Sequence, residues 1–329
     1  MRLLVFEFIS GGGLVNEALP DHLAREGLMM RTALLADLSA LKNVELIVLN
    51  DARISEPQVQ GRLLVIEQGI NLMAYLTAVQ DNYEAVWLIA PESSGILVDW
   101  QQFFMQQNKL LCLSGEKALL LCQHKLNTIQ HLEKFGVSCV SSQKYDSFLP
   151  IESGEWVLKP MDSVACEQTY LLQTQQDWQD KLPKLAEQED YLLQPYIKGQ
   201  TLSLSGLFFQ GECVLICCNQ QHISLIDNQF QLDACLVNVN QEKRTDYQAL
   251  CSQIALAIPE LWGYIGIDLI ETEQGECFVL EINPRLTSSY AGIKAATGLN
   301  VAEHVLALLN EKTPVLQHTK SASIPVTIH

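Results

Sequence analysis

The sequence is short of basic residues. Lys and Arg number 21 against 38 Asp and Glu, which gives a formal net charge of −17 over 329 residues. A nucleic-acid backbone is bound through clustered positive charge, so this balance argues against a nucleic-acid partner. An anionic nucleotide could bind only where local Lys, Arg and a divalent cation override the overall negative field.

Long hydrophobic runs are also missing, and none approaches the ~18 residues that a membrane-spanning helix requires. We therefore expect no membrane partner. The apolar residues 1–9 weakly resemble a signal peptide, but Glu7 interrupts them and the following residues 10–13 form a poor cleavage site. We interpret this segment as a first strand.

The ten cysteines show no CxxC spacing. Without a secretion signal, we expect them to be reduced, in a cytoplasmic protein. Two nucleotide-binding signatures are absent as well. No G-x-x-x-x-G-K-[ST] occurs, and Asn16 stands where G-x-G-x-x-G requires its last glycine.

What is present is the composition of a globular protein, with 48% hydrophobic and 18% charged residues. The length suggests two or three domains. Residues 1–115 alternate strands with helices, which predicts a doubly wound parallel sheet, an α/β layer. The strands are expected at 3–9, 45–49 and 85–90, and the helices at 23–41, 71–80 and 97–107.

The pattern changes from about Gly115. A helix over 116–135, with Gly136 as its stop, is followed mainly by strands, so this part is expected to be an α+β body. Strands are expected at 137–140, 155–159, 169–173, 191–195, 201–209, 213–218, 222–226 and 231–237, and helices at 177–188, 245–257 and 301–310. The final residues 320–329 are expected to be loose or an edge segment.

The most informative pattern lies in the strand-like runs 263–270 and 278–285. Glu281 and Asn283 stand two apart, so their side chains leave the same face of a strand. Asp268 on the first run would lie opposite Glu281, and two facing carboxylates about 5 Å apart repel. Mg²⁺ (or Mn²⁺) removes the conflict, because it binds carboxylate and amide oxygens and leaves positions for phosphate. We predict a metal site at Asp268, Glu281 and Asn283; the alternative is an exposed pair of acids without a metal.

This pairing rests on a two-residue hairpin turn at Gln274-Gly275. The turn places Asp268 opposite Glu281. It also places Gly266 opposite Asn283, where the glycine leaves space. One residue of slip would move Asp268 to the other face of the sheet.

Two lysines are candidates for binding phosphate. Pro160 keeps Lys159 extended at the end of a strand, so the ammonium projects from that end. Lys125 begins a helical stretch, where anions are favoured, although a solvated surface lysine is an equal alternative. Between two further strand-like runs, backbone groups of a hinge could read an adenine edge; the hinge comprises Gln194, Pro195, Tyr196 and Ile197.

Taken in order, these segments resemble the ATP-grasp superfamily. The order is a helix with Lys125, the strand end at Lys159, the hinge, Asp268, and then Glu-x-Asn-Pro-Arg at 281–285. The resemblance covers roughly residues 116–310, and Glu-x-Asn-Pro-Arg is its most specific element. Within the superfamily, the start at residues 6–13 is similar to that of tyramine–L-glutamate ligases.

The resemblance implies a domain organisation. A pre-ATP-grasp α/β domain would cover residues 1–115, an ATP-grasp domain residues 116–315, and a C-terminal tail residues 316–329. The ATP-grasp domain would divide into a lid part at about 116–193 and a metal-bearing part at about 194–315.

The resemblance also implies an ADP-forming ligase that joins a carboxylate to an amine through an acyl phosphate. By family match, the predicted acids and amide hold Mg²⁺, and Lys125 and Lys159 hold the ATP phosphates. Arg285 would be catalytic and stabilise charge on the transferring phosphoryl group. Positioning and charge neutralisation supply most of the catalysis in such chemistry.

The sequence departs from the family in two places. The family usually follows Lys-Pro with a glycine-rich phosphate loop, but residues 161–169 contain no glycine. Glycine allows backbone N–H groups to approach phosphate closely, so hydroxyls such as Ser163 would have to substitute. Relatives also place an acid after the hinge for the ribose, and Gln200-Thr201 offers none.

Substrate contacts are expected near the first strand. Ser10, Gly11, Gly12 and Gly13 follow it, and they either leave room for a substrate at the carboxyl end of the strand or form a tight turn. A buried ammonium needs a counter-charge, which makes Glu7 a candidate. Pairing with a nearby Arg, or capping of a loop, is the alternative for Glu7. Tyr290 is a candidate wall of an aromatic pocket.

The resemblance therefore implies transfer of a γ-glutamyl group to tyramine or a similar amine, in methanofuran-type cofactor biosynthesis. One alternative is an ATP-grasp ligase for other amino acids or peptides. Another is a catalytically impaired nucleotide-binding regulatory protein. Small-molecule carboxylates and amines are the expected partners, and assembly into a homo-oligomer is left open.

Overall fold

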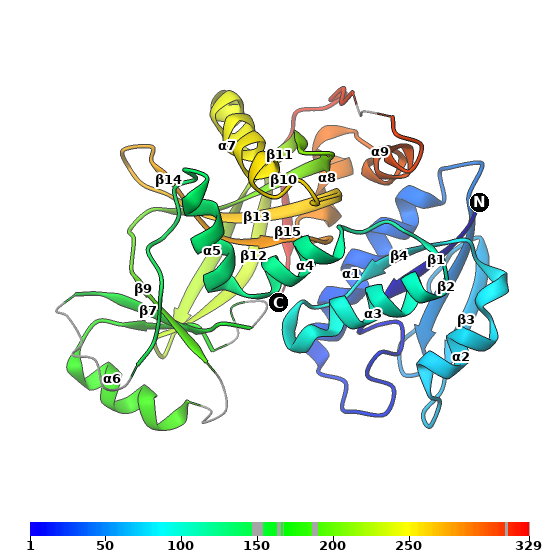
Figure 1. Cartoon of the computed structure of the whole chain (residues 1–329), viewed down its shortest axis with the longest axis horizontal. Helices are drawn as coiled ribbons and strands as arrows, with labels where there is room; N and C mark the ends of the chain where they lie inside the picture. The colour runs from blue at the N-terminus through cyan, green and yellow to red at the C-terminus, as the bar shows by residue number, and fades with distance from the viewer. Residues whose placement is uncertain (147–153, 163–165, 167, 186–189, 313–314, 329) are drawn as a thin grey trace.

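The computed structural model describes residues 1–146, 154–162, 166, 168–185, 190–312 and 315–328. Two sheets divide the chain, a parallel sheet in its first third and a larger antiparallel sheet in the rest (Figure 1). Within the described residues, no helix is both long and apolar enough to cross a membrane.

The first sheet has the order β3-β2-β1-β4-β5, and all of its pairings are parallel. Its strands are β1 (Arg2–Glu7), β2 (Glu45–Asp51), β3 (Gly61–Ile66), β4 (Ala85–Ile89) and β5 (Leu110–Leu111). Its helices are α1 (Asp21–Leu38), α2 (Leu72–Ala78) and α3 (Ile96–Gln106). Leu3 and Val5 share one core cluster with α1, and Leu4 and Phe6 share another with α2 and α3. Alternate residues of one strand face opposite sides, so the predicted doubly wound layer is confirmed.

The sequence did not indicate β3 or β5. β3 is an edge strand whose apolar run, residues 63–66, is short enough to fit a strand or a buried helix equally well. β5 has two residues and pairs only with β4. Short edge elements therefore carry little pattern of their own.

The second sheet has the order β14-β13-β10-β11-β12-β8-β7-β9-β6, with β15 beside β12, and its ladder pairings are antiparallel. Its strands are β6 (Gln143–Lys144), β7 (Trp156–Pro160), β8 (Tyr170–Leu172), β9 (Tyr191–Pro195), β10 (Gln200–Phe209), β11 (Glu212–Ile226), β12 (Gln229–Val239), β13 (Gly263–Glu271), β14 (Cys277–Asn283) and β15 (Ile324–Thr327). β11 is one long strand where two were expected, with irregular pairing at residues 218–219 and 222–223. The strand expected at 137–140 is wrong, because Cys139 forms only an isolated bridge to Val279.

The helix expected over 116–135 is two helices, α4 (Glu116–Gln123) and α5 (Lys125–Lys134). The chain breaks at His124, whose backbone is extended (φ −106°, ψ 99°) and whose imidazole accepts a hydrogen bond from the N–H of Asn127. This N-cap places Lys125 at the first position of α5.

The β13–β14 hairpin confirms the predicted pairing of Asp268 with Glu281 and of Gly266 with Asn283. The predicted two-residue turn is wrong, because Glu271 pairs with Cys277 and the Thr272 N–H bonds to the Glu276 carbonyl around a three-residue loop. Leu269 then pairs with Val279, so Leu280 is an extra residue, a β-bulge that corrects the register before Glu281.

The remaining helices are α6 (Gln175–Lys181), α7 (Arg244–Ala257), α8 (Tyr290–Thr297) and α9 (Val301–Leu308). The sequence did not indicate α8, which packs against α1 of the first layer and against β15. β15 lies within the segment that was expected to be loose or an edge. Contacts of α1 with α8 and α9 join the two layers (Figure 1).

Candidate active site

Asp268 and Glu281 face each other from β13 and β14, as the register requires. Asp268 accepts hydrogen bonds from Asn283 Nδ2 and Gln221 Nε2, both at 3.0 Å. Burial and the neighbouring Glu281 carboxylate raise the pKa of Asp268 to about 8. The two carboxylates therefore repel each other, and a bound cation would relieve this repulsion.

The two predicted lysines lie close to Glu281. Both are buried, and Lys125 Nζ lies 3.5 Å from Glu281 Oε2. Burial lowers the pKa of Lys159, against the attraction of Glu281. Burial alone would raise the pKa of Glu281, but the ammonium groups of Lys125 and Lys159 bring it below its ordinary value. Glu281 is therefore ionised at neutral pH.

The donor set fits a divalent cation. Asp268 and Glu281 offer carboxylate oxygens, and Asn283 would offer its amide oxygen once the amide turns away from Asp268. Within the described residues, no group of three or more His, Cys, Asp or Glu side chains could hold a metal. Two carboxylates and an amide leave positions for phosphate and water, as Mg²⁺ requires.

Gly266 lies opposite Asn283 but makes room for a different side chain. A Cβ on Gly266 would approach the Thr287 methyl group to 2.5 Å. Thr287 in turn bonds to Tyr264 and Ser289 hydroxyls at 3.0 Å each. The glycine therefore serves the turn after Arg285 rather than the metal site.

A cavity beside the acids is lined by Lys125, Lys159, Asp268 and Glu281 together with all four predicted hinge residues, Gln194, Pro195, Tyr196 and Ile197. We call it the nucleotide cavity. Its apolar lining residues are Val140, Val157, Ile223, Phe230, Ile270 and Leu280. The rings of Tyr196 and Phe230 stack with centroids 6.3 Å apart. An apolar cavity with stacked rings beside two lysines suits a purine with attached phosphates.

The bulge at Leu280 shapes this cavity. In a regular strand, successive side chains point to opposite faces, yet Leu280 and Glu281 both line the nucleotide cavity. A bulge allows this by adding a residue to one strand. The hairpin thereby places an apolar wall and a predicted metal ligand side by side.

Ser163 lies outside the described residues, so its predicted phosphate contact has no structural test. In the same glycine-free segment, Cys166 and Gln168 have φ of 60° and 48°, the left-handed region that favours glycine. Cys166 also lines the nucleotide cavity. The backbone at these two positions therefore has a glycine-like conformation without glycine.

Arg285 is nearly buried and is bonded to the first layer. Its Nε and one terminal nitrogen donate to Glu92 Oε2 at 2.9 and 2.7 Å, and the other terminal nitrogen donates to the Leu286 carbonyl. Burial disfavours its charge, but Glu92 raises the pKa of Arg285 above its ordinary value. Glu92 follows β4, so this pair joins residues 193 positions apart.

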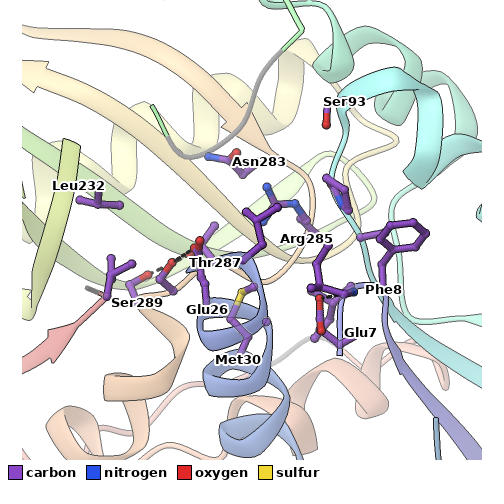
Figure 2. Close-up of a pocket in the computed structure, with 18 of the residues that line it drawn as sticks. Glu7, Phe8, Glu26, Met30, Ser93, Leu232, Asn283, Arg285, Thr287 and Ser289 are labelled. Atoms are coloured by element: carbon purple, nitrogen blue, oxygen red, sulfur yellow. Dashed lines mark hydrogen bonds between the residues drawn. The ribbon is translucent and has the colours of Figure 1, made fainter. Parts of the chain in front are cut away.

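A second cavity adjoins the first and shares Asp268, Glu281, Gln221 and Cys166 with it. We call it the acceptor cavity. It also contains Asn283, Arg285 and Glu7, and Figure 2 shows Glu7 and Phe8 on one side of it and Glu26, Thr287 and Ser289 on the other. The site thus lies between the two layers of the chain.

The residues expected to contact substrate near the first strand divide into two groups. Glu7 lines the acceptor cavity but caps the following loop, because its carboxylate accepts hydrogen bonds from the Ile9 and Ser10 N–H groups and the Ser10 hydroxyl. Burial raises the pKa of Glu7, although these hydrogen bonds and Arg31 oppose the shift. In the structure, Glu7 therefore caps the loop that follows the first strand, as the alternative expectation stated.

The glycines form the tight turn rather than the cavity wall. A Cβ on Gly11 would meet the Glu7 carbonyl at 2.5 Å, and one on Gly13 would meet the Phe8 ring at 2.3 Å. Gly12 has φ +94°. Ser10, Gly11, Gly12 and Gly13 do not line the acceptor cavity, which Phe8, Ile9 and Leu14 do.

The expectation that Tyr290 forms a pocket wall is wrong. Tyr290 is buried in the core beneath α1, with its ring edge-on to Tyr264 and its hydroxyl donating to Asp37 at 2.8 Å. Its position at the start of α8 points it into the interface between the layers, and it lines neither cavity.

No sequence pattern selected Gln221, Glu92 or Glu26 as site residues. Gln221 lies between the strands expected at 213–218 and 222–226. The structure has a single strand there, β11, which continues through Gln221. Glu92 could have been found, since it follows β4 at the carboxyl edge of a parallel sheet, where ligands gather. Glu26 lies on α1. It reaches the site only because α1 packs against the turn after Arg285, where the Ser288 hydroxyl donates to it.

Comparison with known proteins agrees with this geometry. The sequence model of the ATP-grasp domain matches residues 122–289, and that of the pre ATP-grasp 3 domain matches residues 44–119. Tyramine–L-glutamate ligases of Methanocaldococcus fervens and Methanocaldococcus jannaschii are 27% and 28% identical over 111 and 127 residues. The matched segments cover 34% and 38% of this chain, and only 36% and 38% of those enzymes.

Solved structures show the same fold over nearly the whole chain. An ATP-grasp superfamily protein from Archaeoglobus fulgidus aligns with a TM-score of 0.73 at 18% identity, covering 99% of this chain and 92% of its own. An L-amino acid ligase from Bacillus licheniformis aligns with a TM-score of 0.66 at 15% identity, covering 93% and 73%. With an ATP-grasp domain matched over 122–289 and this fold, the chain belongs to the ATP-grasp family.

Proposed function

We propose that the chain is an ADP-forming ligase that activates a carboxylate with ATP and joins it to an amine. The observation that carries the proposal is the position of the Asp268–Glu281 pair. The two acids line both the nucleotide cavity, with Lys125 and Lys159, and the acceptor cavity, with Arg285. A phosphoryl group held by the lysines would then face a carboxylate held on the other side of the acids.

The chemistry follows from this arrangement. A substrate carboxylate oxygen attacks the γ-phosphorus, the bond to the ADP oxygen breaks, and an acyl phosphate forms. The acceptor ammonium gives one proton to a carboxylate of the acceptor cavity, and the amine nitrogen then attacks the carbonyl carbon. Phosphate leaves with the C–O electron pair, and the nitrogen passes its second proton to the departing phosphate. Lys125 and Lys159 neutralise the transferring phosphoryl charge, and Arg285 does so from the acceptor side. When bound at Asp268, Glu281 and Asn283, Mg²⁺ would add charge neutralisation at the phosphates.

For the substrates, we propose the γ-carboxyl group of glutamate and tyramine or a similar amine, with methanofuran-type cofactor biosynthesis as the setting. The partial similarity to tyramine–L-glutamate ligases supports this choice. The acceptor cavity supports it as well, because apolar side chains line it beside carboxylates and a single arginine. Such a lining suits a cation with an apolar body.

The rival from another class is a regulatory protein that only binds nucleotide. The metal-ligand set, both lysines and Arg285 favour an enzyme, because binding alone requires fewer charged groups around the phosphates. Ligases for other amino acids or peptides differ from the proposal only in the contents of the acceptor cavity.

The test is ADP release measured across a matrix of carboxylates and amines, with the products identified by mass. The proposal expects release that depends on both substrates and an amide that joins them. ADP release that needs no amine, or no ADP release with any pair, contradicts it. For substitutions of the site glutamates, the control is Glu273→Gln, which removes a glutamate charge at the exposed tip of the β13–β14 hairpin.

A further inference from the structure

The carboxylates around the acceptor cavity differ in how far they are already occupied. Glu7 holds the loop at Ile9 and Ser10. Asp268 and Glu281 belong to the predicted metal site. Arg285, the one arginine or lysine on this wall among the described residues, is paired with Glu92 outside it.

Glu26 is the remaining carboxylate of the cavity. It is half-buried on α1, and its Oε1 accepts a hydrogen bond from the Ser288 hydroxyl. Across the part of the chain that the structure describes, no Lys, Arg or His lies within ion-pair distance of Glu26. Arg285 interacts with the Glu26 charge at longer range, but its direct ion pair is with Glu92. A carboxylate accepts about four hydrogen bonds, so Glu26 retains capacity for a ligand.

The surroundings of Glu26 suit an organic cation. The apolar side chains nearest in sequence to it on the cavity wall are Leu23 and Met30. Leu232 of β12 and Ile328, which directly follows β15, also line the cavity. These last two, with Glu26, also line a third cavity that opens past His22 and Phe230. Figure 2 shows Glu26 close to Met30 and Thr287, with Arg285 between it and Glu7. Glu26 thus stands where two connected cavities meet.

We propose that Glu26 binds the ammonium group of the acceptor amine and so determines the preference for cationic acceptors; this rests on the proposed ligase function. A desolvated ammonium requires a counter-charge, and the free capacity of Glu26 supplies it. The Ser288 hydroxyl fixes the carboxylate, and the apolar wall takes the body of the amine. Glu7 is excluded from this role by its loop contacts.

The first experiment compares Glu26→Gln with the wild type in steady-state kinetics. The variant keeps the shape of the side chain and removes its charge. We expect KM for tyramine to rise about 10- to 100-fold, as for a lost charge-assisted hydrogen bond, with KM for ATP and glutamate changed less than about twofold. Asp21→Asn, an exposed acid on the same helix outside both cavities, is expected to leave all three KM values unchanged. A rise in the glutamate KM instead of the tyramine KM overturns the assignment.

The second experiment does not depend on turnover. Calorimetry compares binding of tyramine with that of 4-ethylphenol, which has the same ring and no amine, to the intact protein. We expect the wild type to prefer tyramine, Asp21→Asn to keep this preference and Glu26→Gln to lose it. An unchanged preference in Glu26→Gln, or no tyramine binding by the wild type, overturns the inference. Absence of ligase turnover with measurable tyramine preference would refute the proposed function alone.

Discussion

Glu281 lines both cavities and lies next to the two lysines of the nucleotide cavity. Its carboxylate lies 3.5 Å from Lys125 Nζ and opposite Asp268. Glu281→Gln keeps the shape but removes a metal-ligand charge, so we expect turnover to fall on the order of 10²-fold or more. Steady-state kinetics with saturating Mg²⁺ and ATP measures this, with Glu273→Gln as the control. Turnover near that of the wild type would remove Glu281 from the metal site.

We predict that Asp268 makes metal binding depend on pH. Its pKa of about 8 lies above the ordinary value of 3.8, so the folded metal-free protein binds this proton more tightly than the unfolded chain does. The free energy of unfolding therefore decreases as pH rises between these values. Mg²⁺ must displace the proton below pH 8, so we expect Mg²⁺ to raise the melting temperature more at pH 8.5 than at pH 6.5.

Thermal unfolding with and without Mg²⁺ at both pH values tests this expectation. Asp268→Asn removes the titrating group and should abolish the pH dependence of the Mg²⁺ effect. An equal shift at the two pH values in the wild type would show that Asp268 does not titrate against the metal.

At the scale of elements, the bulged hairpin makes a separable contribution to nucleotide binding. Leu280 is the extra residue of β14 and lines the nucleotide cavity only. Truncation to alanine removes apolar contact, so we expect Leu280→Ala to raise KM for ATP about 3- to 10-fold. KM for the amine should stay within about twofold, since the side chain does not reach the acceptor cavity. The exposed Leu256→Ala is the control, and an unchanged KM for ATP would contradict the role given to the bulge.

The hairpin also shows how far the sequence could be interpreted. The pairing of Asp268 with Glu281 was predicted from an assumed two-residue turn, and it holds because the bulge at Leu280 compensates for the longer loop. The length of the turn could not be predicted, since a two-residue turn and a three-residue loop with a compensating bulge lead to the same strand partners. Gly275 has φ +83°, which both turns accept. The sequence therefore predicted that Asp268 pairs with Glu281, but not the conformation of the loop that joins the two strands.

Other parts of the site depend on packing that no local pattern encodes. The grouping of Lys125, Lys159, the hinge and the acids could be predicted, because their order along the chain resembles that of the ATP-grasp superfamily. Glu26 and Glu92 meet the Arg285 turn across 262 and 193 residues, and such contacts exist only after the layers dock. Tyr290 was misplaced for the same reason, because α8 packs on α1 and turns the ring into the interface.

At the scale of the whole molecule, the pair between Arg285 and Glu92 links the two layers. Both side chains are nearly buried, and Glu92 Oε1 is also buried without a hydrogen-bond partner among the described residues. Glu92→Gln leaves the Arg285 charge without its counter-ion, so we expect the free energy of unfolding to fall by about 3–5 kcal/mol. Chemical denaturation measures this change.

The control for that pair is Glu260→Gln, which breaks an exposed pair with Lys117. Exposed pairs contribute about 0–1 kcal/mol, so its effect should be small. Equal effects of the two substitutions would show that the buried pair does not stabilise the docking of the layers.

The central claim concerns the route of the carboxylate oxygen, which the two cavities on either side of Asp268 and Glu281 imply. The most direct test supplies the carboxylate substrate with both oxygens labelled with ¹⁸O and analyses the products by mass spectrometry. We predict that one labelled oxygen leaves in inorganic phosphate, with ADP as the nucleotide product, and that the other stays in the amide. Unlabelled phosphate, or labelled AMP with release of pyrophosphate, would contradict the acyl phosphate and with it the proposed ligase mechanism.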